Sequence, residues 1–128
     1  MSGYERFARE THHRGRGRVA EEEAVRWLAG QGYQLVETNA TTNAGEIDVV
    51  ARDGDTLCFI EVKARSSADF GPAIEAVDLR KQRRLARAAA LYLALHGLET
   101  PCRFDVLGMD REGEQWRFTL VKDAFEAG

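Results

Sequence analysis

The sequence predicts a single domain of the α/β or α+β class, for three reasons. Segments with helical periodicity alternate with segments whose apolar residues recur at every second position. The chain has 128 residues, enough to bury one core. No apolar run approaches the roughly 20 residues of a membrane-spanning helix. Because the N-terminus is also polar and charged, we expect a cytoplasmic protein with no signal peptide and no membrane partner.

Helical periodicity predicts a first helix over residues 19–31 and a longer one from Asp78 to His96. Asp78 is the expected N-cap of the second helix, and Gly97 is its expected stop. The expected buried stripe of this helix is Leu85, Ala86, Ala89, Leu93 and His96.

The remaining pattern predicts five strands, separated by loops and turns. The expected strands are Tyr33–Thr38, 45–51, 57–63, Cys102–Gly108 and Trp116–Val121. The expected connections are loops at Asn39–Ala44 and Ser66–Gly71 and a turn at Asp110–Gly113, with Phe125 packed on the core. Residues 1–18 are rich in Gly, His and Arg without periodicity, so they predict a flexible basic arm before a single domain at 19–128.

The most informative segment is Gly45–Arg65, GEIDVVARDGDTLCFIEVKAR. Its two alternating halves flank an Asp-Gly pair, which is a strong signal for a two-residue hairpin loop. A loop at Asp53-Gly54 makes Asp48 and Glu61 diagonal neighbours, whereas a loop at Gly54-Asp55 places them directly opposite each other. Either loop puts both carboxylates on one face of the hairpin.

Two carboxylates this close repel each other unless a cation lies between them, and Mg²⁺ is the natural guest. Lys63 points to the same side as Glu61 and could stabilise negative charge on an attacking water or a phosphate. The alternative is an ordinary solvated face of a hairpin. Leu57 and Phe59 share that face, however, so it is not simply exposed to solvent.

Asp48, twelve intervening residues and then Glu61-Val62-Lys63 resemble the signature of the restriction-endonuclease-like, or PD-(D/E)XK, nuclease superfamily. A longer series of motifs follows in order: GEID at 45–48, EVKAR at 61–65, FGPAIEAV at 70–77, Lys81, RFDV at 103–106 and DAF at 123–125. From about residue 19 to residue 125, the chain resembles the YraN-like family of small bacterial proteins, which are similar to archaeal Holliday-junction resolvases.

This resemblance implies an α/β fold with a restriction-endonuclease-like core, in which helices flank a mixed central sheet made of an antiparallel three-strand meander and further strands. It implies that Mg²⁺ or Mn²⁺ is bound by Asp48, Glu61 and the backbone carbonyl of Val62, with Lys63 in a catalytic role. The family also carries an acid on the first helix, seven residues before a leucine. Counting back from Leu28 selects Glu21 as this catalytic acid.

Two departures from the family pattern concern this proposed site. Ala20 replaces a glycine of the family, and Glu21 has acidic neighbours at Glu22 and Glu23. The alternative for these acids is that they complement the positive end of the helix dipole. The segment Asn39–Ala44 also lacks an arginine that the family commonly carries before its GEID motif.

The charge distribution suggests an anionic partner, although 18 basic and 21 acidic residues give a net charge of −3. Four arginines of the second helix follow i, i+3, i+4, i+7 spacing on one face without acidic partners: Arg80, Arg83, Arg84 and Arg87. A solubilising face is the alternative. We expect these arginines, with Lys81 and Arg65, to contact nucleic-acid phosphates.

The sequence therefore favours a metal-dependent endonuclease acting on DNA, with branched and four-way-junction DNA among the candidate substrates. A catalytically weak or inactive nucleic-acid-binding module of the same fold is the alternative. Glycoside hydrolysis by the carboxylate pair fits less well, because Lys63 and the basic helix suit phosphate better than sugar. A homodimer is expected only by analogy with resolvases.

Two further pairs of residues predict structural roles. Cys58 and Cys102 are expected to be small buried hydrophobic residues. Arg103 and Asp105 share a strand face, from which they could pair across to the catalytic face, but a structural ion pair is the preferred interpretation.

Overall fold

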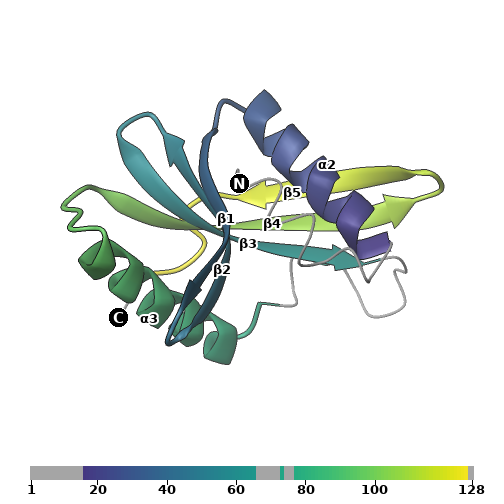
Figure 1. Cartoon of the computed structure of the whole chain (residues 1–128). Coiled ribbons are helices and arrows are strands. Elements are labelled where there is room, and N and C mark those ends of the chain that lie inside the picture. Colours follow the sequence, from purple (N-terminus) through teal and green to yellow (C-terminus); the bar gives the residue numbers. More distant parts are fainter. Residues whose placement is uncertain (1–15, 66–72, 74–76, 127–128) are drawn as a thin grey trace.

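The computed structural model describes residues 16–65, 73 and 77–126, and the side chains from Ala20 onward. It contains one five-stranded sheet with a helix on each face (Figure 1). The elements are α2 (Arg16–Gly30), β1 (Gln34–Thr42), β2 (Gly45–Asp53), β3 (Thr56–Arg65), α3 (Leu79–Leu95), β4 (Cys102–Glu112) and β5 (Gln115–Val121). In this described part of the chain, neither helix is long and apolar enough to cross a membrane.

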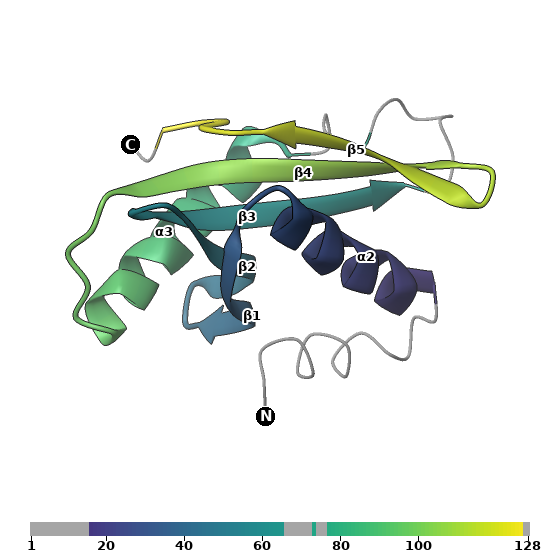
Figure 2. The ribbon, with the colours of Figure 1, turned by 90° about the horizontal axis from the view of Figure 1, so that it is seen from above.

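The strands follow one another across the sheet in the order β1-β2-β3-β4-β5. All neighbours are antiparallel except β3 and β4, which run parallel and are joined through α3 (Figure 2). A parallel pair needs a crossover connection, whereas tight turns are enough for antiparallel neighbours. The chain is therefore α/β with a mixed sheet, and the predicted three-strand antiparallel meander is β1-β2-β3.

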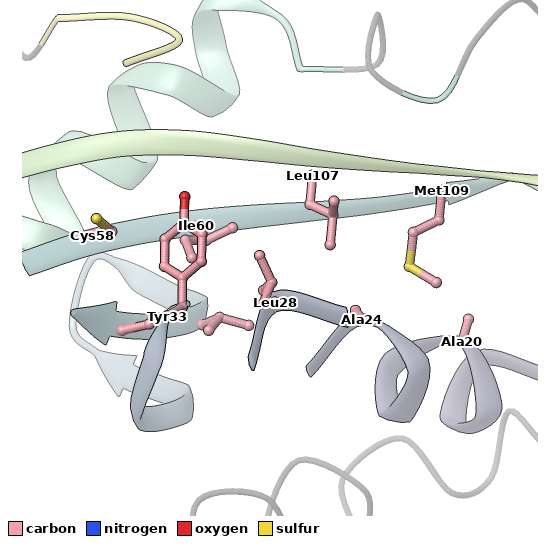
Figure 3. Close-up of a cluster of buried hydrophobic side chains, with 10 residues drawn as sticks. Ala20, Ala24, Leu28, Tyr33, Cys58, Ile60, Leu107 and Met109 are labelled. Carbon is pink, nitrogen blue, oxygen red and sulfur yellow. The ribbon is translucent and has the colours of Figure 1, made fainter. Parts of the chain in front are cut away.

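The core has two halves, one under each helix. Between α2 and the sheet, Ala20, Ala24 and Leu28 pack against buried residues of β3 and β4 such as Ile60 and Leu107 (Figure 3). On the opposite face, α3 packs against a second cluster of buried residues that includes Leu57, Phe59 and Phe104. Because successive strand residues point to opposite faces, Cys58 and Ile60 face α2 while Leu57 and Phe59 face α3.

The hairpin between β2 and β3 turns at Gly54-Asp55, because Asp53 pairs with Thr56. Gly54 has φ 64°, a left-handed conformation that glycine adopts without steric cost. The sequence allowed two loops. The structure contains the loop at Gly54-Asp55, so the alternative prediction of a loop at Asp53-Gly54 is wrong. Leu57 and Phe59 are fully buried, as expected for a face that is not simply solvated.

The predicted loop at Asn39–Ala44 is wrong, since β1 continues to Thr42 and leaves only Asn43 and Ala44 as a turn. Thr41 and Thr42 pair with the start of β2, and the Thr42 hydroxyl donates to the carbonyl of Gly45 at 2.8 Å. Tertiary pairing thus extends the strand through residues whose local sequence looked like a loop. A register shift between Leu35 and Glu37 adds an irregularity nearer the start of β1.

Gly45 begins β2 with φ 134°, a conformation that other residues adopt only with strain. A Cβ atom there would lie 3.4 Å from Cγ and Cδ of Arg84 on α3. We expect Gly45→Ala to lower the free energy of unfolding by about 1–3 kcal/mol, measured by urea denaturation, because the backbone strain remains wherever the flexible arginine moves. The double variant Gly45→Ala/Arg84→Ala is the control. Full recovery in the double variant would show that side-chain crowding, not backbone strain, causes the loss.

Both helices match their predicted positions, with corrections at the start of α2 and along the buried stripe of α3. Helix α2 begins at Arg16 instead of Val19, so three residues of the predicted arm are helical. Asp78 caps α3 as predicted, by accepting a hydrogen bond from the backbone N–H of Lys81. The stripe is rotated from the predicted one, because Ala88 and Tyr92 are buried, Ala86 and Leu93 are half-buried and His96 is exposed.

The C-terminal part of the chain also differs in detail from the prediction. Strand β4 extends to Glu112, so the turn before β5 is Gly113-Glu114. Phe125 stacks on Phe104 with ring centroids 5.0 Å apart, as expected for a residue packed on the core. Cys58 is buried as predicted, whereas Cys102 is exposed because it lies at the beginning of β4. The predicted loop at Ser66–Gly71 and the arm before residue 16 lie outside the described residues.

Candidate functional site

Asp48 and Glu61 lie where β2 and β3 stop pairing. The last backbone pair of these strands is Val49 with Ile60, so the next residues along the two strands are Asp48 and Glu61. Oδ2 of Asp48 accepts a hydrogen bond from the backbone N–H of Val62 at 2.8 Å. The Asp48 side chain thus takes the place of the next backbone partner and holds its carboxylate against β3.

Glu61 lies close enough to Asp48 for its charge to affect the ionisation of Asp48. Burial is the main effect that raises the pKa of Asp48, to about 8, and the charge of Glu61 adds to it. The Val62 N–H and the Lys63 charge act in the opposite direction but do not outweigh burial. Glu61 is itself only 9% exposed. A cation is what would allow both carboxylates to be ionised together.

Two lysines adjoin this carboxylate pair. Nζ of Lys63 lies 3.6 Å from Oε1 of Glu61. A hydrogen-bonding contact with Lys63 is the first cause of the lowered pKa of Lys81, which lies in the first turn of α3. The N-terminus of α3 therefore adds a second amine beside β3. The site combines carboxylates that suit a hard cation with amines that suit an anion.

Glu21 lies on α2, and its charge makes a small contribution to the raised pKa of Asp48. Its Oε2 atom is shielded from solvent. The alternative role for Glu21–Glu23 at the helix dipole is wrong, since α2 begins at Arg16 and its first turn has no acidic residue. The structure thus brings Glu21, Asp48, Glu61 and Lys63 into one region from three elements.

The donor set suits a cation that keeps part of its water shell. In the described part of the chain, no three His, Cys, Asp or Glu side chains converge closely enough to form a metal-binding group. Asp48 and Glu61 provide two adjacent carboxylates, and both burial and the charge of Glu61 raise the pKa of Asp48. Two carboxylates with several waters are a normal ligand set for Mg²⁺. The residues present therefore fit such an ion.

Asn39 is a polar residue at this site that sequence reasoning missed. The pairs Thr38 with Val49 and Ala40 with Ile47 place it opposite Asp48, on the strand on the other side from Glu61. Asn39 is 5% exposed with φ 50°, and its Nδ2 atom has no hydrogen-bond partner among the described residues. Asparagine tolerates this left-handed backbone better than most residues. The available signal was its position just before the GEID motif.

The four arginines of α3 have different neighbours in the structure. Arg84 lies against Gly45 at the β1–β2 turn, on the side of α3 that carries Lys81. Arg83 and Arg87 line a groove together with Glu126, which follows β5 near the end of the chain. Arg80 is exposed near the start of the helix and does not line that groove. All four arginines are exposed on one face of α3, as their spacing predicts, but they adjoin different neighbouring elements.

Arg65 ends β3 on the same strand face as Glu61 and Lys63. Its Nε atom is buried and has no hydrogen-bond partner among the described residues. Lys63 and Arg65 therefore form a row of two basic side chains on one face of β3.

Arg103 and Asp105 form the preferred structural ion pair, on the α2 side of the sheet. Asp105 is completely buried and accepts two hydrogen bonds from Arg103, one from the Tyr33 hydroxyl and one from the backbone N–H of Asp123. Arg103 also contacts Asp53 at 2.9 Å. Because Glu61 and Lys63 face α3, the alternative in which this pair reaches the catalytic face is wrong.

Comparison with known proteins identifies the family of this chain. The model of "Uncharacterised protein family UPF0102" matches residues 20–109. The chain belongs to the UPF0102 family. A UPF0102 protein of Chromohalobacter salexigens is 46% identical over 114 residues, covering 89% of this chain and 93% of the relative. A UPF0102 protein of Alcanivorax borkumensis is 48% identical over 101 residues, covering 77% of this chain and 81% of the relative.

The UPF0102 match includes the whole β2–β3 hairpin, α3 and most of β4. A relative from Symbiobacterium thermophilum is 43% identical over 113 residues, which is 87% of this chain and 96% of that protein. These findings confirm the predicted relationship to the YraN-like, UPF0102 proteins. The shared region contains all four residues that were predicted to be catalytic.

Proposed function

We propose that this UPF0102 protein is a metal-dependent endonuclease with a restriction-endonuclease-like core, which hydrolyses DNA phosphodiester bonds in the cytoplasm. The observation that carries the proposal is the adjacent pair of Asp48 and Glu61, with Lys63 3.6 Å from Glu61. Two carboxylates that need a cation, next to amines that need an anion, suit a phosphate held against a divalent ion. Sugar hydrolysis requires no such amines.

In this proposal Asp48, Glu61 and the Val62 carbonyl hold Mg²⁺ or Mn²⁺, which when bound polarises the phosphate and acidifies a water. The backbone N–H of Val62 donates a hydrogen bond to the Asp48 carboxylate and keeps it in place. Lys63 stabilises the negative charge that develops on the phosphate oxygens. Glu21 on α2 adds negative charge near Asp48 without joining the pair of carboxylates as a third ligand.

Phosphates beyond the reacting one would contact Lys81 and Arg84, which lie on the site side of α3. Arg80 and Arg65 extend this basic surface at the start of α3 and the end of β3. Contacts of this kind hold the backbone without recognising sequence. A shape-selective substrate such as branched or four-way-junction DNA, bound by a homodimer, is consistent with them.

The test is a cleavage assay on end-labelled linear duplex, single-stranded, flap and four-way-junction DNA, each with Mg²⁺, Mn²⁺ or EDTA. We expect cutting that depends on the metal, with one DNA shape preferred over the others. Cutting that persists in EDTA would exclude the proposed chemistry. No cutting of any DNA in either metal, by folded protein, would exclude an autonomous nuclease.

One observation favours the alternative of an inactive nucleic-acid-binding module: in the described residues, no three metal-ligating side chains converge. Such a module would bind DNA with an affinity that depends on salt and not on the divalent ion. Retained binding without cleavage in the same assay would support this second function.

A further inference from the structure

A groove lies along the side of α3 that faces away from the carboxylate pair. It has a volume of about 420 Å³ and is lined by Leu79, Gln82, Arg83, Ala86, Arg87 and Ala90 of α3 and by Glu126. Ala86 and Ala90 are one helical turn apart, so their small side chains leave room for a bulky group between them. Leu79 remains 57% exposed at one end of the groove.

Among the described residues, the charged side chains of the groove have no ion-pair partner. Arg83 and Arg87 form no ion pair or hydrogen bond with any described residue. They are four residues apart on one helix, where like charges destabilise each other slightly. Glu126 lines the same groove and carries the opposite charge. The groove is therefore bipolar, with two cations, one anion and an apolar floor.

The groove is separate from the proposed nuclease site. Successive helical residues are rotated by about 100°, so Ala86 and Ala90 lie roughly half a turn around α3 from Lys81 and Arg84. Lys81 and Arg84 contact Lys63 and Gly45, respectively, beside the carboxylates. The floor of the groove at Ala86 and Ala90 therefore faces away from DNA held on that side, whereas Arg83 and Arg87 lie at the edge nearer Arg84.

We propose that this groove docks an acidic amphipathic helix of a partner protein. A bulky apolar side chain of the partner fits over Ala86 and Ala90 beside Leu79, and two carboxylates one turn apart pair with Arg83 and Arg87. A helix that presents apolar and charged side chains at i, i+3 and i+4 matches this arrangement. Nucleic acid fits less well, because its phosphates would gain nothing from the exposed Leu79 or from the small apolar side chains of Ala86 and Ala90.

The test is selection of binders from a display library of helical peptides, with the full-length chain as bait. We expect the selected peptides to share a bulky apolar residue flanked by Asp or Glu. Fluorescence anisotropy with a selected peptide should show affinity reduced at least tenfold by Arg83→Glu/Arg87→Glu, and by Ala90→Phe, which fills the groove without changing charge. Arg111→Glu/Arg117→Glu on the β4–β5 hairpin changes the net charge equally and should leave affinity unchanged.

Circular dichroism melts of all variants establish that each one is folded. Three results would overturn the proposal: no enrichment of helical peptides, enrichment of peptides without acidic residues, or binding that survives both groove variants. Displacement of a selected peptide by duplex DNA, with DNA affinity reduced by Arg83→Glu/Arg87→Glu, would assign the groove to nucleic acid instead and also overturn it.

Discussion

Replacement of Asp48 by asparagine is expected to abolish metal-dependent DNA cleavage and, at the same time, to stabilise the metal-free protein at neutral pH. The amide oxygen can still accept the hydrogen bond from the Val62 N–H, so the local structure is retained. It cannot supply a negatively charged ligand, and we expect a loss of more than about a hundredfold in cleavage, since even outer-shell changes at metal sites cost 10–100-fold.

The stability effect of Asp48→Asn follows from the raised pKa of Asp48. Burial makes the charged carboxylate unfavourable in the folded chain, so its pKa is about 8 instead of 3.8. Such a group favours folding most below pH 3.8, and this contribution is lost as the pH rises toward 8. Asparagine does not ionise, so Asp48→Asn does not lose stability in this way as the pH rises. At pH 7 we expect its free energy of unfolding to exceed that of the parent by at least about 1 kcal/mol.

Urea denaturation in EDTA at pH 5 and pH 7, together with the cleavage assay, checks both expectations. The stability difference between variant and parent should grow with pH. Added Mn²⁺ should stabilise the parent and not the variant, because a ligand stabilises only the folded state that binds it. Glu46→Gln, on an exposed residue of the same strand, is the matched control. Equal cleavage by parent and Asp48→Asn would remove Asp48 from catalysis.

Asp105→Asn is expected to destabilise the fold by about 3–5 kcal/mol, the usual cost of breaking a buried ion pair. Asp105 is completely buried and accepts four hydrogen bonds, from Arg103 twice, Tyr33 and the Asp123 backbone. An asparagine would offer one acceptor oxygen and turn its NH₂ group toward donors. The Arg103 guanidinium would then lose its buried counter-charge, while Asp53 would still contact it.

This network responds to pH in the direction opposite to Asp48. Burial tends to raise the pKa of Asp105, but Arg103, the Asp123 N–H and Tyr33 outweigh it and hold the pKa below its usual value. A lowered carboxyl pKa contributes stability above the pKa of the unfolded chain, and this stability is lost as the pH falls through the folded pKa. Acid should therefore destabilise the parent more than Asp105→Asn.

Urea titrations of parent and Asp105→Asn at pH 7 and pH 3 test this prediction. Asp55→Asn, on the exposed hairpin turn, is the control and should change the free energy of unfolding by less than about 0.5 kcal/mol. A loss of only that size for Asp105→Asn would show that the buried network does not hold β4 and the C-terminal segment together.

Local sequence signals were enough to predict the elements that depend on neighbours along the chain. The Asp-Gly pair restricted the hairpin loop to two positions, and both put Asp48 and Glu61 on one face. Asp78 and Gly97 defined the ends of α3, since caps act through hydrogen bonds to residues within one turn. The carboxylates and Lys63 were accessible to prediction because a strand has a strict period of two.

The corrections come from contacts between segments that are distant in the sequence. Strand β1 continues through Thr41 and Thr42 because β2 offers backbone partners to them. The buried stripe of α3 includes Ala88 and Tyr92 instead of His96, because the sheet determines which side of the helix is covered. Helical periodicity alone does not tell which edge of that apolar stripe is buried against the sheet.

Within the candidate site, the sequence by itself identified the residues of the proposed chemistry: the two carboxylates, the lysine after them and the basic residues of α3. Only the tertiary structure decided their surroundings. It selected the loop at Gly54-Asp55, placed Asn39 opposite Asp48, and gave Arg84 and Arg83 different neighbours. The physical reason is that residue type and local period follow from covalent sequence, whereas burial and charge pairing depend on which distant segments pack together.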